Sequence, residues 1–179
     1  MAVKTKEIIL NALLQLLESN ELDKITVTDL VEKCKISRQT FYYHFEDLSQ
    51  LYQWLFTSET DKILKEAIEK DDWARVVLQY VRFLKTYSIL LKKAASSSMY
   101  EFIYTQMHKS AVTILNYFYD NHPHIKNNFQ RDIEFEIKYN AHGFVGYAID
   151  MAVNDNNDYE KFAMDVSKFY FDQIKHALN

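Results

Sequence analysis

Residues 25–45 read ITVTDLVEKCKISRQTFYYHF, and this stretch has the pattern of two short helices joined by a tight turn. Thr26 is a favourable N-cap, and Asp29, three residues later, completes a capping box. We therefore expect the first helix to begin at Val27. Ser37 is a second N-cap, so a second helix is predicted directly after it.

The second of these helices has one apolar and one polar face. Phe41 and Phe45 are four residues apart, which places both rings on the face that anchors the helix. The polar residues are Arg38, Gln39, Thr40, Tyr42, Tyr43 and His44. Their guanidinium, amide, hydroxyl and ring groups suit phosphate oxygens and base edges in a major groove of DNA. On this chemistry alone a polar surface helix that binds nothing is an equal alternative, because such faces are common.

The composition predicts an all-α chain. Among 179 residues there are only two glycines and one proline, so material for tight turns is scarce. The formal net charge is −4, and residues 1–45 carry six basic and six acidic side chains. The DNA-binding end is thus neutral, and we expect it to depend on specific contacts and on dimerisation more than on non-specific attraction.

Apolar spacing predicts where the helices lie. We expect them over about residues 5–19, 27–34, 38–45, 46–70, 73–84, 87–91, 99–119, 130–153 and 159–177. Ile133 to Tyr139 alternate like a strand, but a single strand would have no partner, so we assign helix there. Asp71 or Asp72 is expected to cap the helix that contains Trp73.

Several chemistries are set aside. Both glycines fall inside one predicted helix, so no glycine-rich phosphate loop exists, and no nucleophile elbow, zinc-protease motif or cysteine pair occurs. His122 and His124, with His108 or His142, lack a clear third ligand, so we predict no metal site. We expect no cofactor and no enzymatic activity. No apolar run is long enough for a membrane span or a signal peptide, and we expect a cytoplasmic protein with no membrane partner.

The order of these features resembles the N-terminal DNA-binding domain of the TetR family of bacterial transcription regulators. The resemblance rests on a first helix over residues 5–19, then ITVTDL, then ISRQTFYYHF, then Leu51. It implies that the six polar residues of the second helix lie on a recognition helix, with Thr28 near a phosphate. It also implies division into a helix-turn-helix domain, 1–45, and a helical effector-binding and dimerisation domain, 46–179.

Two positions depart from the family pattern. Lys35 stands where the turn usually holds glycine, so a non-glycine residue must take a left-handed conformation at a modest cost. Leu48 stands where the family often has a lysine that contacts a phosphate.

The second domain is expected to sense and to dimerise. Aromatic and methionine side chains there could line an effector pocket or be ordinary core. The candidates are Tyr80, Phe83, Tyr87, Phe102, Met107, Tyr117, Phe144 and Tyr147. The last two helices carry more apolar surface than one buried face needs, and the resemblance implies that they form a homodimer interface. A symmetric dimer would bind near-palindromic double-stranded DNA.

The resemblance implies a repressor that a small-molecule effector releases from its operator. A narrower resemblance, carried by Arg38-Gln-Thr-Phe-Tyr42 and the aromatic-rich second domain, is to activators of dihydroxyacetone kinase operons. That branch would imply an activator that responds through a protein co-regulator. The alternative of another class is a helical small-molecule-binding module or small enzyme without a role at DNA.

Overall fold

The computed structural model describes residues 2–70, 73–123, 132–155 and 158–178. Within these ranges every regular element is a helix, which confirms the predicted all-α class. In chain order the elements are α1 (Ala2–Leu17), the 3-10 turn η1 (Leu22–Lys24), α2 (Val27–Cys34), α3 (Arg38–His44), α4 (Leu48–Lys70), α5 (Trp73–Thr86), α6 (Ser88–Ala94), α7 (Tyr100–Asn121), α9 (Ile133–Val153) and α10 (Tyr159–Leu178).

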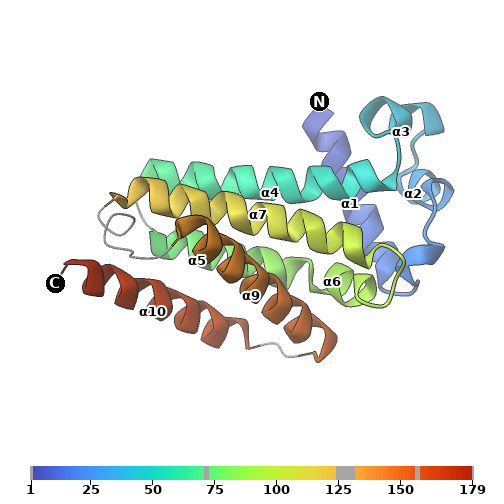
Figure 1. Ribbon diagram of the computed structural model, residues 1–179. Coiled ribbons are helices and arrows are strands. Elements are labelled where there is room, and N and C mark those ends of the chain that lie inside the picture. Colours follow the sequence, from blue (N-terminus) through green and yellow to red (C-terminus); the bar gives the residue numbers. More distant parts are fainter. Residues whose placement is uncertain (1, 71–72, 124–131, 156–157, 179) are drawn as a thin grey trace.

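The first three helices gather at one end of the molecule (Figure 1). α1 packs on α2, and α2 packs on α3. Each of them contributes a fully buried side chain to a shared core: Leu13, Leu30 and Phe41. This small apolar centre fixes the position of α3 relative to the rest of the chain.

Helix α4 leads from this end into the second half of the chain. Its start is fixed by Asp47, whose carboxylate accepts the backbone N–H of Gln50 at 2.8 Å. Leu51 and Leu55 are fully buried, and α4 packs against both α5 and α7. Helix α4 therefore joins the N-terminal end of the molecule to the core of the second half.

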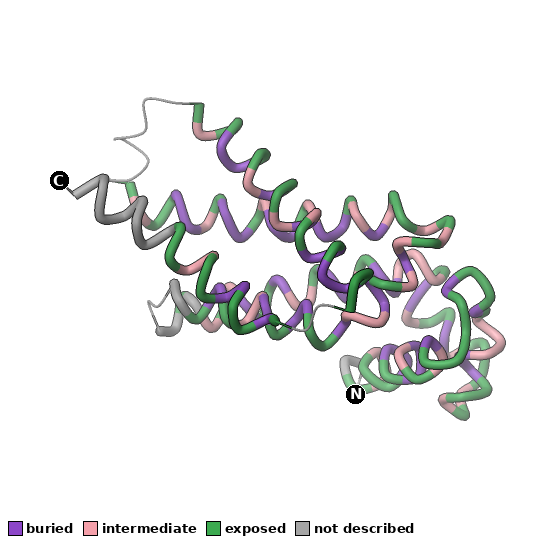
Figure 2. Tube along the Cα trace, turned by 90° about the horizontal axis from the view of Figure 1, so that it is seen from below, coloured by how far each residue is buried: buried purple, intermediate pink, exposed green. Residues whose placement is uncertain are grey.

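The second half is a bundle in which long helices pack against one another in pairs. α7 packs between α4 and α9, while α5 packs between α4 and α10. Buried positions line the facing sides of these helices, and exposed positions follow the outer sides (Figure 2). The short helix α6 contacts α1, η1 and α9, so it touches both halves of the molecule.

Some boundaries differ from the prediction. α1 covers Ala2–Leu17 and ends before Ser19, and the side-chain amide of Asn20 caps this end by donating to the carbonyl of Leu16 at 2.8 Å. The alternating stretch from Ile133 is helical, as predicted, and Asp132 caps it by accepting the N–H of Glu134 at 2.9 Å. The 3-10 turn η1 was not predicted.

A few predictions lie outside the described residues: the cap at Asp71 or Asp72, the role of His124, and the helix start at Gln130. Among the described helices, none is long and apolar enough to cross a bilayer.

Candidate nucleic-acid interface

The start of α2 is fixed by a reciprocal cap. Thr26 donates its backbone N–H to the carboxylate of Asp29 at 2.7 Å, and the N–H of Asp29 donates to the Thr26 hydroxyl at 3.3 Å. The hydrogen bonds from Thr26 hold the pKa of the Asp29 carboxyl below its ordinary value. The predicted capping box is thus confirmed, and Thr28 lies in the first turn of α2.

The turn between α2 and α3 depends on Lys35. Its φ is 54° and its ψ is 43°, in the left-handed region predicted for this residue. The next residue, Ile36, donates its N–H back to the carbonyl of Val31 at 3.0 Å, which closes the end of α2. The backbone of Lys35 therefore has a conformation that suits glycine better, and the tight turn forms without a glycine.

Helix α3 is held by its cap and by two rings. Ser37 accepts the N–H of Thr40 at 3.0 Å, and the two hydroxyls are 2.8 Å apart. Phe41 and Phe45 are buried, with ring centroids 5.8 Å apart. Phe45 also lies 5.9 Å from the ring of Trp54 on α4, so α3 is fixed against the next helix as well.

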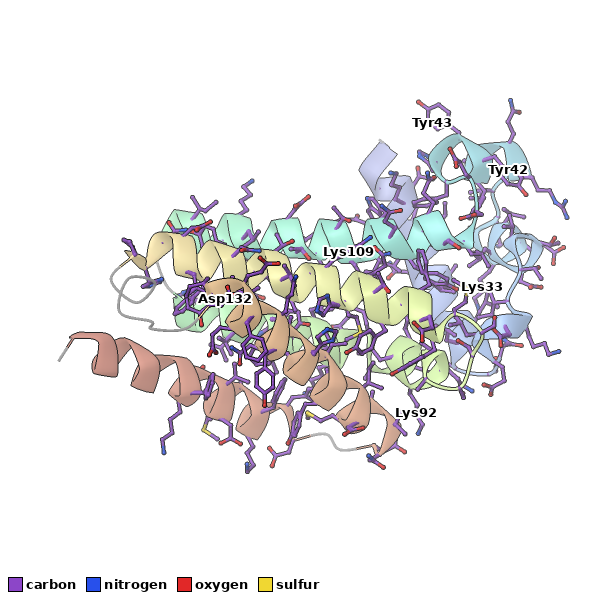
Figure 3. The ribbon with its side chains drawn as sticks, in the orientation of Figure 1. Lys33, Tyr42, Tyr43, Lys92, Lys109 and Asp132 are labelled. Carbon is purple, nitrogen blue, oxygen red and sulfur yellow. The ribbon has the colours of Figure 1, made fainter. Side chains whose placement is uncertain are left out.

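The polar residues of α3 divide into an outer edge and two flanks. With Phe41 facing the core, helical spacing directs Gln39 and Tyr43 most directly outward. Tyr43 is 81% exposed and Tyr42 is 54% exposed, and both project away from the bundle (Figure 3). Arg38 is also exposed. The six residues thus form a broad arc.

Thr40 and His44 lie on the opposite flank and are half-buried. The Thr40 hydroxyl is engaged with the Ser37 cap, so it is less available than the side chains at the centre of the arc. The ring of His44 contacts that of Tyr43 edge to face, with centroids 4.9 Å apart.

Two predicted residues from different helices meet at this surface. The Arg38 guanidinium donates from Nη2 to the Thr28 hydroxyl at 2.7 Å. The sequence gives no signal for this contact, because it depends on how α2 and α3 pack. It makes the start of α2 and the exposed side of α3 one continuous polar surface.

Lys6 of α1 extends the same end of the molecule. Its ammonium lies over the rings of Phe45 and Trp54, 5.1 and 5.5 Å from their centroids. Cation–π contact of this kind holds a positive charge beside the α3–α4 junction. Lys6 therefore places a positive charge next to α3, at the same end of the molecule.

The eight predicted pocket residues do not line one cavity. Tyr80 and Phe144 line a small cavity of about 30 Å³ between α5, α7, α9 and α10. Phe83 and Tyr87 line a crevice of about 220 Å³ beside α4, and Phe144 and Tyr147 line a groove of about 320 Å³ between α9 and α10.

The other three are placed differently: Met107 is fully buried, and Phe102 and Tyr117 are half-buried against the core. The set is scattered because these residues lie on different sides of α5, α7 and α9, with Tyr87 between α5 and α6.

No group of three or more potential metal ligands occurs among the residues that the structure describes. The rings of His108 and His142 are tilted by 32° with centroids 4.1 Å apart, and His142 Nδ1 is 2.8 Å from the Tyr104 hydroxyl. His122 instead hydrogen-bonds the carbonyl of Phe118 through Nδ1 at 2.8 Å.

The two halves of the chain are also joined by polar contacts that were not predicted. The Asp23 carboxylate on η1 accepts the backbone N–H of Ser98 at 3.0 Å and its hydroxyl at 2.8 Å. Glu21 forms an ion pair with Lys93 of α6 at 2.5 Å. The end that presents α3 is therefore tied to the second half at η1 as well as through α4.

Helix α3 is short and firmly anchored, and its exposed side carries hydrogen-bond donors and aromatic rings. It follows directly after a tight turn that joins it to another helix. This arrangement defines a helix-turn-helix DNA-binding domain. Residues 9–53 match the family model of the bacterial regulatory proteins of the tetR family. The N-terminal part of this chain is thus a TetR-family DNA-binding domain. Regulators of this family are generally not enzymes.

One curated relative is the HTH-type dhaKLM operon transcriptional activator DhaS of Lactococcus lactis subsp. lactis (strain IL1403). The two chains are 29% identical over 92 residues, which is 51% of this chain and 49% of the relative. The matched part thus spans about half the length of that relative.

Two solved structures share the fold. The dihydroxyacetone kinase operon activator DhaS superposes with a TM-score of 0.78 at 22% identity, covering 97% of each chain. The TetR family repressor AlkX from Dietzia sp. strain DQ12-45-1b has a TM-score of 0.56 at 17% identity, covering 95% of this chain and 97% of its own. Together with the family match, these likenesses support a TetR-type DNA-binding regulator.

Proposed function

We propose that this chain is a homodimeric transcription regulator in which residues 1–45 bind a near-palindromic operator and residues 46–179 dimerise and sense a signal. The observation that carries the proposal is the geometry of α3. Phe41 and Phe45 fix one side of the helix in the core, and the opposite side presents an exposed polar arc to a major groove.

Within this arc we assign different roles by position. Arg38 and Thr28 together suit a phosphate or a guanine edge at the start of the two helices. Gln39 and Tyr43 point most directly outward and suit base edges, with Tyr42 beside them. Thr40 and His44, being half-buried, are assigned contacts at the border of the interface.

The outer sides of α9 and α10 support dimerisation. Exposed apolar side chains on these two helices are Phe135, Tyr139, Tyr147, Val153, Met164 and Phe169. A Cβ placed on Gly143 or Gly146 would meet no atom of the described residues within 4 Å, so neither glycine is needed for packing among them. A second copy could approach α9 closely at these positions. Two half-sites bound together would also compensate for the neutral charge of the DNA-binding end.

The control that we propose first is repression relieved by a small molecule. An effector that binds only the conformation with misplaced recognition helices would lower operator affinity. α4 joins α3 to the bundle, and the Asp23–Ser98 contact gives a second connection. Both would carry the change to α3.

Activation is the second candidate. The observation that favours it is that the matched curated relative, and a structure that superposes over 97% of this chain, are both described as operon activators named DhaS. In that case the second half would respond to a protein co-regulator, and operator binding would recruit transcription.

The test is footprinting of the full-length protein on DNA upstream of its own gene and its neighbours, at two salt concentrations. A protected near-palindrome that survives competitor DNA is the expected result. A folded dimer that protects no site would contradict the proposal. A reporter driven from the protected region then separates the two candidates, because deleting the gene raises expression under repression and lowers it under activation.

A further inference from the structure

Two cations lie at opposite ends of α3, and neutral groups hold both of them. At the start of the helix, the Arg38 guanidinium donates to the Thr28 hydroxyl at 2.7 Å. At its end, the Lys6 ammonium lies 5.1 Å from the ring centroid of Phe45 and 5.5 Å from that of Trp54. Among the residues that the structure describes, neither cation forms an ion pair with a carboxylate. Both charges therefore remain available to an anion.

Other lysines of the chain are held in a different way. Lys92 forms an ion pair with Asp155 at 2.6 Å, and Lys138 forms one with Glu134 at 2.5 Å. A carboxylate at this distance offsets much of the attraction that the ammonium would have for a second anion. Aromatic rings attract an ammonium through their quadrupole and leave its net charge unchanged. Lys6 is thus fixed in position without being neutralised.

The junction between α3 and α4 has no strongly basic residue of its own. Between Arg38 and Lys62 the sequence contains no lysine or arginine. Glu46 and Asp47 follow α3 directly, and both are exposed. Their carboxylates would repel a DNA strand that passes this end of the helix. Lys6 brings a compensating positive charge to the junction from a different helix, α1.

The length of α3 suits the width of a major groove. The helix runs from Arg38 to His44, and seven helical residues rise by about 10 Å. The major groove of B-DNA is about 12 Å wide, and the phosphates of the two strands border its two sides. The N-terminal end of α1 and α3 lie on the same side of α4 (Figure 1). A DNA groove that receives α3 therefore brings one strand toward Arg38 and the other toward Lys6.

We propose that Lys6 binds a DNA phosphate on the strand that borders the C-terminal end of α3, opposite the strand that Arg38 approaches. Phe45 and Trp54 act as positioning residues for the ammonium, so less side-chain freedom is lost when DNA binds. The inference rests on the proposed function, because it adds a backbone contact to the same DNA interface. It also explains how a domain without net positive charge can hold both sides of a groove.

A phosphate contact has a distinct effect on binding, because it carries no sequence information. Each neutralised phosphate contributes about 0.9 to the slope of log affinity against log salt concentration. A symmetric dimer has two Lys6 side chains, so removal of both charges should reduce the magnitude of this slope by about 2. By the same relation, affinity at about 0.1 M salt should fall roughly eightfold for each half-site.

The test compares Lys6→Met with Lys4→Met in the full-length protein. Methionine keeps an unbranched apolar side chain over the rings and removes the charge. Lys4 is exposed on the same helix, so Lys4→Met changes the net charge of this end equally. Anisotropy titrations use two labelled duplexes of equal length, the footprinted operator and an unrelated sequence, from about 50 to about 200 mM salt. Lys6→Met should weaken binding to both duplexes by a similar factor and reduce the slope, whereas Lys4→Met should leave both nearly unchanged and Lys6→Arg should restore them.

A double-mutant cycle tests the role of the rings. Trp54→Leu removes one ring beneath the ammonium and should weaken binding to both duplexes roughly threefold. The same change in Lys6→Met should have no further effect, because no charge remains to be positioned. An equal effect in both backgrounds would show that Trp54 acts on α3 and does not position Lys6.

The outcomes separate this inference from the proposed function. Circular dichroism checks that each variant is folded, and Lys6→Gln replaces Lys6→Met if the latter is not. Wild-type affinity and slope in the Lys6 variant, equal losses in Lys6→Met and Lys4→Met, or a loss confined to the operator would overturn the phosphate contact alone. A folded wild-type dimer that binds neither duplex would instead refute the regulator.

Discussion

The two ends of this molecule expose aromatic side chains for different reasons. At the DNA-binding end, Tyr42 and Tyr43 are exposed on a helix of seven residues that is fixed by its cap and by two buried rings. At the other end, Phe135 and Tyr139 are stacked and exposed on α9, a helix of 21 residues. Tyrosine rings beside Arg38 and Gln39 on a short, rigid helix suit DNA. Exposed rings repeated along a long helix suit a second copy of the chain.

The largest effect that would test this comparison is loss of the buried anchor of α3. Phe41→Ala removes a fully buried ring and should cost about 3–5 kcal/mol of folding free energy, enough to unfold the DNA-binding end. Tyr42→Ala, at the exposed neighbouring position, is the control and should leave stability nearly unchanged. Thermal and urea unfolding, followed by circular dichroism, measure both. A Phe41→Ala variant as stable as Tyr42→Ala would show that α3 is not anchored by this ring.

A charged substitution on α9 tests whether its exposed rings form a dimer interface. Phe135→Glu places a carboxylate on the face assigned to the homodimer and should weaken dimerisation by about 2–4 kcal/mol. Ile68→Glu is the matched control, since Ile68 is 65% exposed on α4 and Phe135 is 59% exposed. Sedimentation over a range of concentrations gives the dissociation constants. Equal dissociation constants for the two variants would remove Phe135 from the interface.

Much of the structure of the DNA-binding end could be predicted from the sequence, because local signals determine its helices. Thr26 and Ser37 are predicted as caps from residues only three or four positions apart. The left-handed Lys35 is instead predicted from the family resemblance, in which this turn usually holds glycine. The helical class and the division into core and exposed faces follow from spacing along the chain.

The rest depends on how helices pack, which spacing along one helix does not determine. The contact between Arg38 and Thr28 requires the packing angle of α2 on α3. The predicted pocket failed to form one cavity because periodicity identifies a buried side of a helix without showing which neighbour faces it. Tyr80 and Phe144 meet at one cavity, whereas Phe83 lies beside α4.

A smaller effect would sharpen the functional assignment of the DNA-binding end. Arg38→Ala removes the guanidinium from the exposed arc and should weaken specific operator binding by about 1–3 kcal/mol per half-site, without unfolding the protein. Lys109→Ala is the charge-matched control, because Lys109 lies on α7, away from α3 (Figure 3). Anisotropy titrations at several salt concentrations measure both. Unchanged affinity of folded Arg38→Ala would exclude this residue from the contact.

The smallest expected effect concerns the turn that sets the angle of α3. Lys35 has a φ of 54°, and a left-handed conformation costs a side-chain-bearing residue about 1–2 kcal/mol. Glycine avoids this cost but loses about 0.4–1 kcal/mol through the greater freedom of its unfolded chain. Lys35→Gly should therefore stabilise the protein by about 0.5–1 kcal/mol, whereas Lys33→Gly, within α2, should destabilise it by a similar amount. Opposite shifts in urea midpoint would show that the turn stores conformational strain, and a loss of stability in both variants would show that the Lys35 side chain stabilises the turn by more than its backbone conformation costs.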